Sequence, residues 1–369
     1  MIYYFILILV VYVSSIWSLI YGFDKVETKQ KQGLVPTTKF SVIVPFRNEE
    51  SDFLNLLNSF STLNYPKNLF EIIAVNDDSD DDSVQIFSKW QRENPTIPAQ
   101  LLQNVRTSNA PKKDAISTAI SRIKNDWIMT TDADCVVNAN WLLAFDHAIQ
   151  NSNSEMLVGA VSIKETQGFL NYFQFVDLLS LQGTTIGSFG INKPFMCNGA
   201  NFAYTKNLFL ALNGFEGNNK IASGDDVFLL QKAIKKCPKK VEYLKNKEAI
   251  VFTKSENSWS KLFSQRVRWA SKTASYDGFF GKFLATVVFA MNLNLIVSFI
   301  FLPFVFCVLL FLVKVSIDLI LLYKTKKFIG SKKFSIPVLS SIFYPIFCVS
   351  VATYSLFGKF EWKNRSFNA

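Results

Sequence analysis

Histidine is almost absent from this chain of 369 residues, which contains a single one, and cysteine is scarce and dispersed. The five cysteines lie at positions 135, 197, 237, 307 and 348, with no closely spaced pair and no Cys/His cluster. A structural zinc site needs about four such ligands close together, so the sequence argues against one. Nothing in this cysteine pattern requires an oxidising compartment.

Charge is missing from residues 1–21, an apolar run about long enough to cross the hydrocarbon core of a membrane. A cleaved signal peptide would carry a basic start and a small-residue cleavage site, and neither is present. The sequence therefore predicts a permanent N-terminal transmembrane anchor. Basic residues follow this segment and none precedes it, which places the polar linker 22–38 in the cytosol.

Further apolar blocks follow residue 283 and contribute to a hydrophobic content of 49%. The block 283–323 is too long for one span and contains Pro303, so we expect two transmembrane helices that form a hairpin. The block 335–357 is either a transmembrane or an interfacial helix. The loop 324–333 between the blocks is basic and should be cytosolic.

The net charge of +10 allows two interpretations, because basic proteins bind nucleic acids as well as anionic membranes. The basic runs of this chain lie between apolar segments, which is typical of cytosolic loops that obey the positive-inside rule. We therefore expect a multi-pass protein of the cell membrane that contacts membrane lipids. Its soluble domain should be cytosolic, and no nucleic-acid partner is expected.

Residues 39–280 have the pattern of an α/β domain. Three continuous apolar runs stop abruptly in polar or acidic residues: FSVIVPF, FEIIAVND and WIMTTDAD. Such runs are typical of parallel strands that are buried on both faces, and the helical stretches between them indicate βαβ units. Active sites in such sheets lie beyond the carboxyl ends of the strands, which is where the acidic residues fall. The segment 165–190 is aromatic-rich and amphipathic, and is either an interfacial or acceptor-channel helix or an ordinary core helix.

Asp132 and Asp134 end the run WIMTTDAD and are separated by one residue. Two carboxylates placed just past a strand can both reach one hard cation, such as Mg²⁺ or Mn²⁺, which prefers oxygen ligands. Such a cation could neutralise a diphosphate leaving group. The alternative is a turn or capping role, because Asp-x-Asp triplets are common.

Three further clusters allow both a chemical and a structural interpretation. Asp77 directly follows a predicted strand, whereas the acidic residues after it fit a helix N-terminus. Asp226, in the segment SGDD, is either part of a helix cap or a general base for a hydroxyl nucleophile. The segment QRVRW offers an Arg for a diphosphate and a Trp for a sugar ring, or else belongs to a membrane-interface belt.

In this order the clusters resemble the motifs of family 2 glycosyltransferases, the inverting group that includes cellulose, chitin and hyaluronan synthases and ceramide glucosyltransferases. The resemblance covers roughly residues 39–275 and is carried by VIVPFRNEE, VNDDSDD, PKKDAISTAI, TDADC, CNGANFAY, SGDD and QRVRW. It implies a GT-A-type nucleotide-sugar-binding domain with a mostly parallel central sheet, flanked by transmembrane helices. It also implies an inverting, metal-dependent transfer from a nucleotide-sugar donor, with a UDP-sugar favoured, to a lipid or glycan hydroxyl.

Carried over residue by residue, the resemblance assigns a role to several side chains. Asp226 would be the catalytic base, and Asp132 and Asp134 would hold the metal. The residues that would close over the diphosphate and the acceptor are Gln265, Arg268 and Trp269. The implied nucleotide-sugar-binding residues are Pro45, Glu49, Asp77, Lys112 and Asp132.

The sequence departs from common family patterns at two positions. Asn76 stands where many members have an acid before Asp77, so only the second acid is retained. Asp225 stands where many have a Glu before Asp226, which leaves the base in place and shortens its neighbour. Neither departure implies an inactive protein.

Two other classes of protein compete with this interpretation. A haloacid-dehalogenase-like phosphatase also uses Asp-x-Asp after a strand, and Asp132 would then be a covalent nucleophile. That alternative leaves VIVPFRNEE and QRVRW unexplained. A non-catalytic membrane scaffold gives no reason for acids to gather repeatedly at strand ends.

Overall fold

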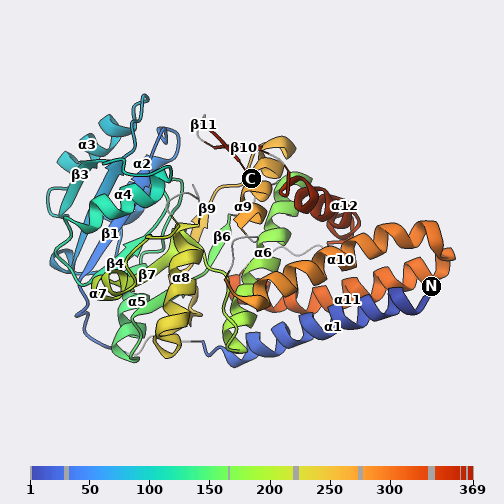
Figure 1. Ribbon diagram of the computed structural model, residues 1–369. Coiled ribbons are helices and arrows are strands. Elements are labelled where there is room, and N and C mark those ends of the chain that lie inside the picture. The colour runs from blue at the N-terminus through green and yellow to red at the C-terminus, as the bar shows by residue number, and fades with distance from the viewer. Residues whose placement is uncertain are drawn as a thin grey trace. The chain divides into compact units, whose positions relative to one another are not determined.

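The computed structural model describes residues 2–28, 33–164, 167–218, 224–272, 277–330, 337–357, 359–362 and 365–368. The chain divides into two compact units, and most of their helices and strands are labelled in Figure 1. The α/β unit consists of Glu27–Ser162 and Met196–Lys254. The helical unit consists of Met1–Val26, Ile163–Phe195 and Ser255–Ala369, and so includes two segments of the range 39–280, which the sequence predicted to be one domain.

A seven-stranded sheet forms the centre of the α/β unit, with its strands in the order β3-β2-β1-β4-β7-β5-β8. Strand β7 runs antiparallel to its neighbours β4 and β5, and the other neighbouring strands are parallel. This arrangement confirms the predicted α/β class with a mostly parallel sheet. The strands are β1 (Phe40–Phe46), β2 (Phe70–Asn76), β3 (Ala99–Gln103), β4 (Trp127–Thr130), β5 (Met156–Gly159), β7 (Phe202–Thr205) and β8 (Val241–Leu244).

Hydrophobic burial on both faces explains the uninterrupted apolar runs of the central strands. In β1, the adjacent residues Val42, Ile43 and Val44 have no exposed surface, although their side chains point alternately to the two faces of the sheet. All seven residues of β2 are buried as well. Strands β1, β2 and β4 lie within the three apolar runs that the sequence indicated.

Helices and short strands complete the α/β unit. Aromatic rings from three helices pack together with β1: Phe46 lies 4.7 Å from Phe53 between ring centroids, Phe53 stacks on Phe87, and Trp141 stacks on Phe60. The helices are α2 (Phe53–Ser61), α3 (Ser83–Glu93), α4 (Pro111–Ile120), α5 (Trp141–Gln150), α7 (Lys206–Ala211) and α8 (Asp225–Lys236). The 3₁₀ turns are η1 (Lys67–Leu69), η2 (Gly199–Asn201), η3 (Pro238–Lys240) and η4 (Lys247–Ala249), and β6 (Val161–Ile163) pairs with β9 (Val251–Thr253).

The buried side chain of Asn201 fixes η2 within the α/β unit. Its Oδ1 accepts a hydrogen bond from Trp141 Nε1 at 3.0 Å, and its Nδ2 donates to the carbonyl oxygens of Ala160 and Ala249 at 2.7 Å each. A buried amide is stable only when its polar atoms are paired in this way. Because η2 begins at Gly199, the third residue of the segment CNGANFAY, this bonding also sets the position of Gly199.

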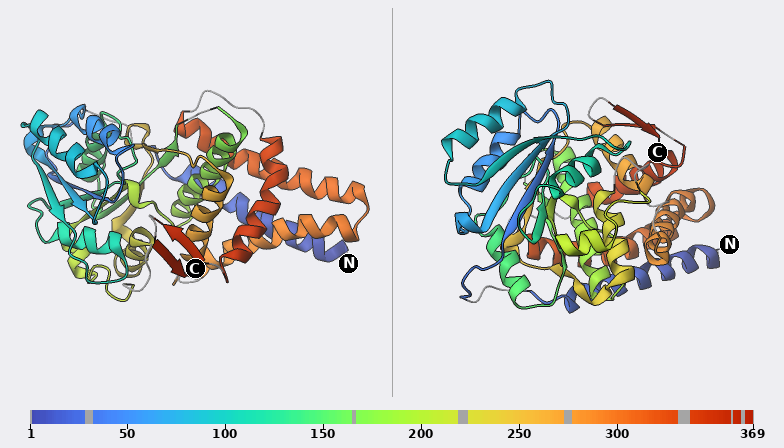
Figure 2. Two further views of the ribbon diagram at one scale, coloured as in Figure 1. Left: turned by 90° about the horizontal axis from the view of Figure 1, so that it is seen from above. Right: turned by 60° about the vertical axis from the view of Figure 1, so that its left-hand side comes forward.

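Within its described residues, the helical unit contains three helices that are long and apolar enough to cross a membrane: α1 (Ile2–Lys25), α10 (Phe279–Phe301) and α11 (Phe304–Ile329). Pro303 stands between α10 and α11, which lie side by side in Figure 2. Helix α12 (Val338–Tyr354) is apolar but shorter. The remaining elements are α6 (Phe169–Gly190), α9 (Trp259–Ser271), β10 (Lys359–Trp362) and β11 (Arg365–Asn368).

Helix α6 packs closely against α1, although the two are far apart in the sequence. A Cβ atom added at Gly187 would lie 2.4 Å from the carbonyl oxygen of Leu19, so only glycine allows this backbone contact. Twelve of the 22 residues of α6 are buried. The segment 165–190 is thus a packed helix over its described part, which excludes residues 165 and 166.

Candidate active site

The carboxyl ends of β1, β2 and β4 meet at one edge of the sheet because these strands are parallel and adjacent. Phe46 lies opposite Asn76 at the end of the β1–β2 pair, and the backbone N–H of Asp77 donates to the carbonyl oxygen of Phe46 at 2.9 Å. Past β4, the N–H of Thr131 donates to the carbonyl oxygen of Ile43 at 3.3 Å. The residues that follow these strands therefore share one edge, as expected for such a sheet.

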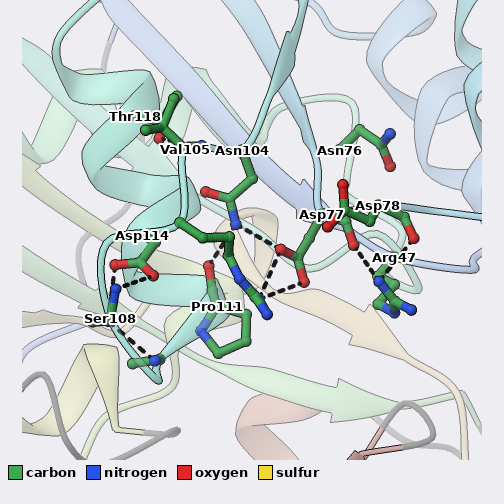
Figure 3. Close-up of polar contacts among 12 residues, drawn as sticks. Arg47, Asn76, Asp77, Asp78, Asn104, Val105, Ser108, Pro111, Asp114 and Thr118 are labelled. Carbon is green, nitrogen blue, oxygen red and sulfur yellow. Dashed lines mark hydrogen bonds and ion pairs between the residues drawn. The ribbon is translucent and has the colours of Figure 1, made fainter.

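Asp77 is buried and lies in a polar cluster at this edge (Figure 3). Its Oδ1 accepts hydrogen bonds from Asn104 Nδ2 at 2.7 Å and from Arg106 Nη1 at 3.0 Å. Arg106 Nη1 also lies 3.3 Å from Asp77 Oδ2. Asn104 and Arg106 follow β3, a strand that the sequence analysis did not identify, so both were missed. The polar residues of QNVR, which directly follow a short apolar run, could have indicated them.

The loop after β1 is bonded to the loop after β2. Arg47 Nη1 donates to the backbone carbonyl oxygens of Asp77 and Asp78 at 2.7 Å each, and Arg47 lies beside both in Figure 3. The backbone N–H of Glu49, a predicted nucleotide-pocket residue, donates to Ser83 Oγ at 2.8 Å. Pro45, the other predicted residue of this segment, lies within β1. The structure thus brings Pro45 and Glu49 to the same edge as Asp77.

The acidic run after Asp77 has the structural role that was expected of it. Asp81 accepts hydrogen bonds from the N–H groups of Glu50 and Ser83, at 3.0 Å each. Burial would raise the pKa of Asp81, but these hydrogen bonds outweigh it and hold the pKa below its ordinary value. Helix α3 begins directly after Asp82, so the run shapes a helix N-terminus.

Lys112, the second residue of α4, joins two of the acidic segments. Its Nζ lies 2.6 Å from Asp132 Oδ1 and 3.4 Å from Asp225 Oδ2. Burial alone would lower the pKa of Lys112, but the carboxylates of Asp132, Asp225 and Asp226 outweigh it and raise that pKa. Lys112 is therefore a firmly charged cation among carboxylates at neutral pH.

Asp226 lies at the start of α8, and its carboxylate is fixed by backbone groups. Its Oδ2 accepts from the N–H of Gly199 and its Oδ1 from the N–H of Val227, both at 2.8 Å. Gly224, with φ of +81°, supplies the left-handed turn before the helix. The side chain is buried, and the preceding Ser223 of the predicted SGDD segment lies outside the described residues.

At Gly199 the η2 turn lies against the charged side chains of Lys112, Asp225 and Asp226. A Cβ atom there would lie 2.9 Å from Asp225 Oδ2 and 3.2 Å from Lys112 Nζ, so a side chain would displace the charged groups. The carbonyl oxygen of Gly199 accepts from Thr130 Oγ1 at 2.7 Å, which ties the turn to the end of β4. The structure thus brings CNGANFAY together with the residues after β4 and at the start of α8.

Asp132 and Asp134 offer two partly exposed carboxylates past β4. Asp134 Oδ2 lies 3.5 Å from Thr253 Oγ1. The neighbouring Cys135 thiol is buried, and its burial, together with the negative charges of Asp134 and Asp132, raises its pKa. Among the described residues, no group of three or more His, Cys, Asp or Glu side chains could hold a metal ion. Mg²⁺ commonly uses one or two carboxylates and takes further ligands from substrate phosphates, and this pair supplies two carboxylates.

The remaining predicted residues, Gln265, Arg268 and Trp269, lie on α9 in the helical unit. Gln265 Nε2 donates to Glu256 Oε1 at 2.9 Å. The guanidinium carbon of Arg266 lies 4.2 Å from the centroid of the Trp269 ring. The site residues thus fall into two groups, one in each unit, and the nucleotide-, metal- and base-assigned side chains all belong to the α/β unit.

Comparison with known proteins identifies relatives of both units. The family model "Glycosyl transferase family 2" matches residues 41–209, and the model "Glycosyl transferase family group 2" matches residues 127–356, more than half of the chain. The probable glycosyltransferase YdaM of Bacillus subtilis is 23% identical over 385 residues, which cover 94% of this chain and 88% of that protein.

Two further relatives differ in what they share with the chain. The poly(ribitol-phosphate) beta-N-acetylglucosaminyltransferase TarS of Staphylococcus aureus is 32% identical over 120 residues, which cover 32% of this chain and only 20% of the length of TarS. The mannosyltransferase PcManGT of Pyrobaculum calidifontis, solved with GDP-Man and Mn²⁺, is 15% identical, with a TM-score of 0.52 over 95% of this chain and 98% of that one. This last likeness shows a GT-A-like fold.

Proposed function

Because the chain belongs to glycosyl transferase family 2, whose members use nucleotide-sugar donors, we propose that it is a membrane-bound inverting enzyme. It transfers a sugar from a nucleotide diphosphate, which we infer to be UDP, to a hydroxyl group of a lipid or glycan. The helices α1, α10 and α11 support the membrane association. The basic residues around the predicted cytosolic segments support a cytosolic catalytic unit in the cell membrane.

One observation carries the proposal: a single cation, Lys112, joins the Asp-x-Asp pair to the start of α8. Its Nζ contacts Asp132 at 2.6 Å and Asp225 at 3.4 Å, and Asp226 is the next residue of the helix. Residues assigned to the nucleotide sugar, the metal and the base are therefore neighbours. A phosphatase of the haloacid-dehalogenase type would not require these residues to lie together beside a nucleotide pocket.

The cluster around Asp77 supports UDP as the nucleotide. The hydrogen-bonding edge of uracil carries one N–H donor between two carbonyl acceptors. Asp77 supplies an acceptor, and the guanidinium of Arg106 supplies a donor beside it.

Asp226 fits the role of general base. In an inverting transfer the acceptor hydroxyl attacks the anomeric carbon opposite the departing diphosphate, and a carboxylate takes its proton. The two backbone N–H groups at 2.8 Å hold the Asp226 carboxylate in one orientation, so it is positioned before the substrate arrives. Lys112, together with a cation held by Asp132 and Asp134, would offset negative charge on the diphosphate.

A nucleotide-sugar screen tests the proposal directly. The full chain, purified in detergent, is incubated with UDP-, GDP- and other nucleotide sugars, and release of the nucleotide diphosphate is measured. We expect release from a UDP-sugar, and its loss in Asp132→Asn but not in the control Asp80→Asn, whose side chain is exposed. Absence of turnover with every donor, or equal activity of the two variants, would contradict the assignment.

A further inference from the structure

Arg266 is a residue of QRVRW to which the family resemblance gives no role, yet its contacts reach two residues that have one. Its Nη1 donates to Gln265 Oε1, and its guanidinium lies over the Trp269 ring at 4.2 Å. Arg268, two residues further along, projects from another side of the same helix. Arg266 is therefore the side chain through which Gln265 and Trp269 are connected.

Arg266 is itself held by a buried ion pair with α6. Its Nε lies 2.6 Å from Asp177 Oδ2, and the two side chains are 7% and 6% exposed. A buried ion pair is costly to desolvate and contributes little net stability, so its presence calls for a reason other than holding the fold together. Arg266 also keeps one buried nitrogen, Nη2, without a hydrogen-bond partner. A stable fold alone would be served as well by apolar residues.

Gln265 is fixed at both ends of its carboxamide. Its Oε1 accepts from Arg266, and its Nε2 donates to Glu256 Oε1 at 2.9 Å. Glu256 is anchored in turn, because its N–H donates to Gln174 Oε1 at 2.8 Å and its carbonyl oxygen accepts from Gln174 Nε2 at 2.9 Å. Both anchors, Gln174 and Asp177, lie on α6 one turn apart.

We propose that Arg266, held by Asp177, is a positioning residue that sets the orientation of Gln265 and Trp269 for sugar transfer. This inference rests on the proposed function, since Gln265 and Trp269 have a task only if the chain transfers a sugar. An Arg suits the role because its planar fork can donate to a carboxylate and an amide while its face stacks on an indole ring. Neither a lysine nor an apolar side chain can make all three contacts.

The double variant Asp177→Leu/Arg266→Met separates positioning from structural support. Replacing both partners of a buried ion pair by apolar residues of similar volume commonly preserves or raises stability. We therefore expect the full-length protein in detergent to keep its melting temperature and its affinity for UDP, which is assigned to the α/β unit. Its kcat should fall ~10²-fold, because misplacement of catalytic groups by about 1 Å costs that much.

Arg266→Lys provides a second variant that retains the charge partner of Asp177. It should stay folded, bind UDP normally and still lose most of its kcat, since the ammonium cannot also contact Gln265 and cover Trp269. Lys261→Met, which removes a cation from the exposed side of the same helix, is the matched control and should keep wild-type kcat. Wild-type kcat in either Arg266 variant would overturn the inference. A wild-type protein that turns over no nucleotide sugar would instead remove the proposed function and this inference with it.

Discussion

Replacing Asp226 by Asn tests the assignment of the base and has a cost that can be worked out from the structure. The carboxylate accepts two backbone hydrogen bonds, from the N–H groups of Gly199 and Val227. An amide has one acceptor oxygen, so its NH₂ group must face one of these donors. Leaving one buried donor unpaired costs about 1–3 kcal/mol. Loss of the negative charge at the α8 N-terminus adds roughly 0.5 kcal/mol.

The expected effect on catalysis of Asp226→Asn is of similar or larger size. Loss of general-base assistance lowers the rate ~10²–10⁴-fold, which corresponds to about 3–5 kcal/mol in the activation barrier. Because both effects are large, kcat must be measured on folded protein, with UDP binding used to count competent sites. Affinity for UDP and for the metal should change little, since those contacts are assigned to Asp77, Asp132 and Asp134.

Asp225→Asn is the matched control on the same helix and should be milder, because Lys112 retains Asp132 as a partner. If Asp226→Asn keeps near-normal transfer and Asp225→Asn abolishes it, the assignment is off by one residue. If both variants stay active, the SGDD segment is only a helix cap and the base lies elsewhere.

Three other predictions follow from the same site and from the membrane helices. Chelation of divalent cations should stop turnover, measured as UDP release, and added Mg²⁺ or Mn²⁺ should restore it; full activity in chelator would contradict the metal assignment. Reporters inserted in 22–38 or 324–333 should read cytosolic, and an outside signal at 324–333 would exclude the predicted hairpin. Arg106→Met should weaken UDP binding ~10-fold in calorimetry, because a charged hydrogen bond is worth about 1.5–3 kcal/mol and this one is partly exposed. Arg122→Met, on the surface, should bind normally and serves as its control.

The strands that carry the site could be predicted because burial on both faces leaves a strong local signal. Strands β1, β2 and β4 are central, and their apolar runs end where the chain leaves the sheet. Strand β3 lies at the edge, and four of its five residues are only half-buried, so its pattern is weaker. The antiparallel strand β7 is set by pairing with β4 and β5, which no local pattern reports.

The boundary between the units could not be predicted, because it depends on contacts between distant segments. Helix α6 is too polar to be recognised as a span and lies between two stretches of the α/β unit in the sequence. Its place in the helical unit follows from backbone contacts such as that of Gly187 with Leu19, which are 168 residues apart. Hydropathy records the composition of a segment, not the surface against which it packs.

The sequence indicated the site residues themselves, but it did not indicate which residues they contact. Parallel strands place Asp77 and Asp132 at one edge by a general rule. No rule states that Lys112 bridges Asp132 and Asp225, because α4 and α8 meet only through the tertiary fold. Arg106 went unnoticed for the same reason, since its partner Asp77 lies 29 positions earlier in the chain.

Charge balance around Lys112 links these contacts to the expected metal requirement. One ammonium group faces the three carboxylates of Asp132, Asp225 and Asp226, which leaves a formal excess of negative charge before any substrate arrives. A nucleotide diphosphate adds further negative charge to the same edge, and like charges at close range in a partly buried site repel one another by several kcal/mol. The single positive charge of Lys112 cannot neutralise both the carboxylates and the diphosphate. A divalent cation at Asp132 and Asp134 would offset two of these negative charges, so we expect donor affinity itself, and not only kcat, to fall when the cation is chelated.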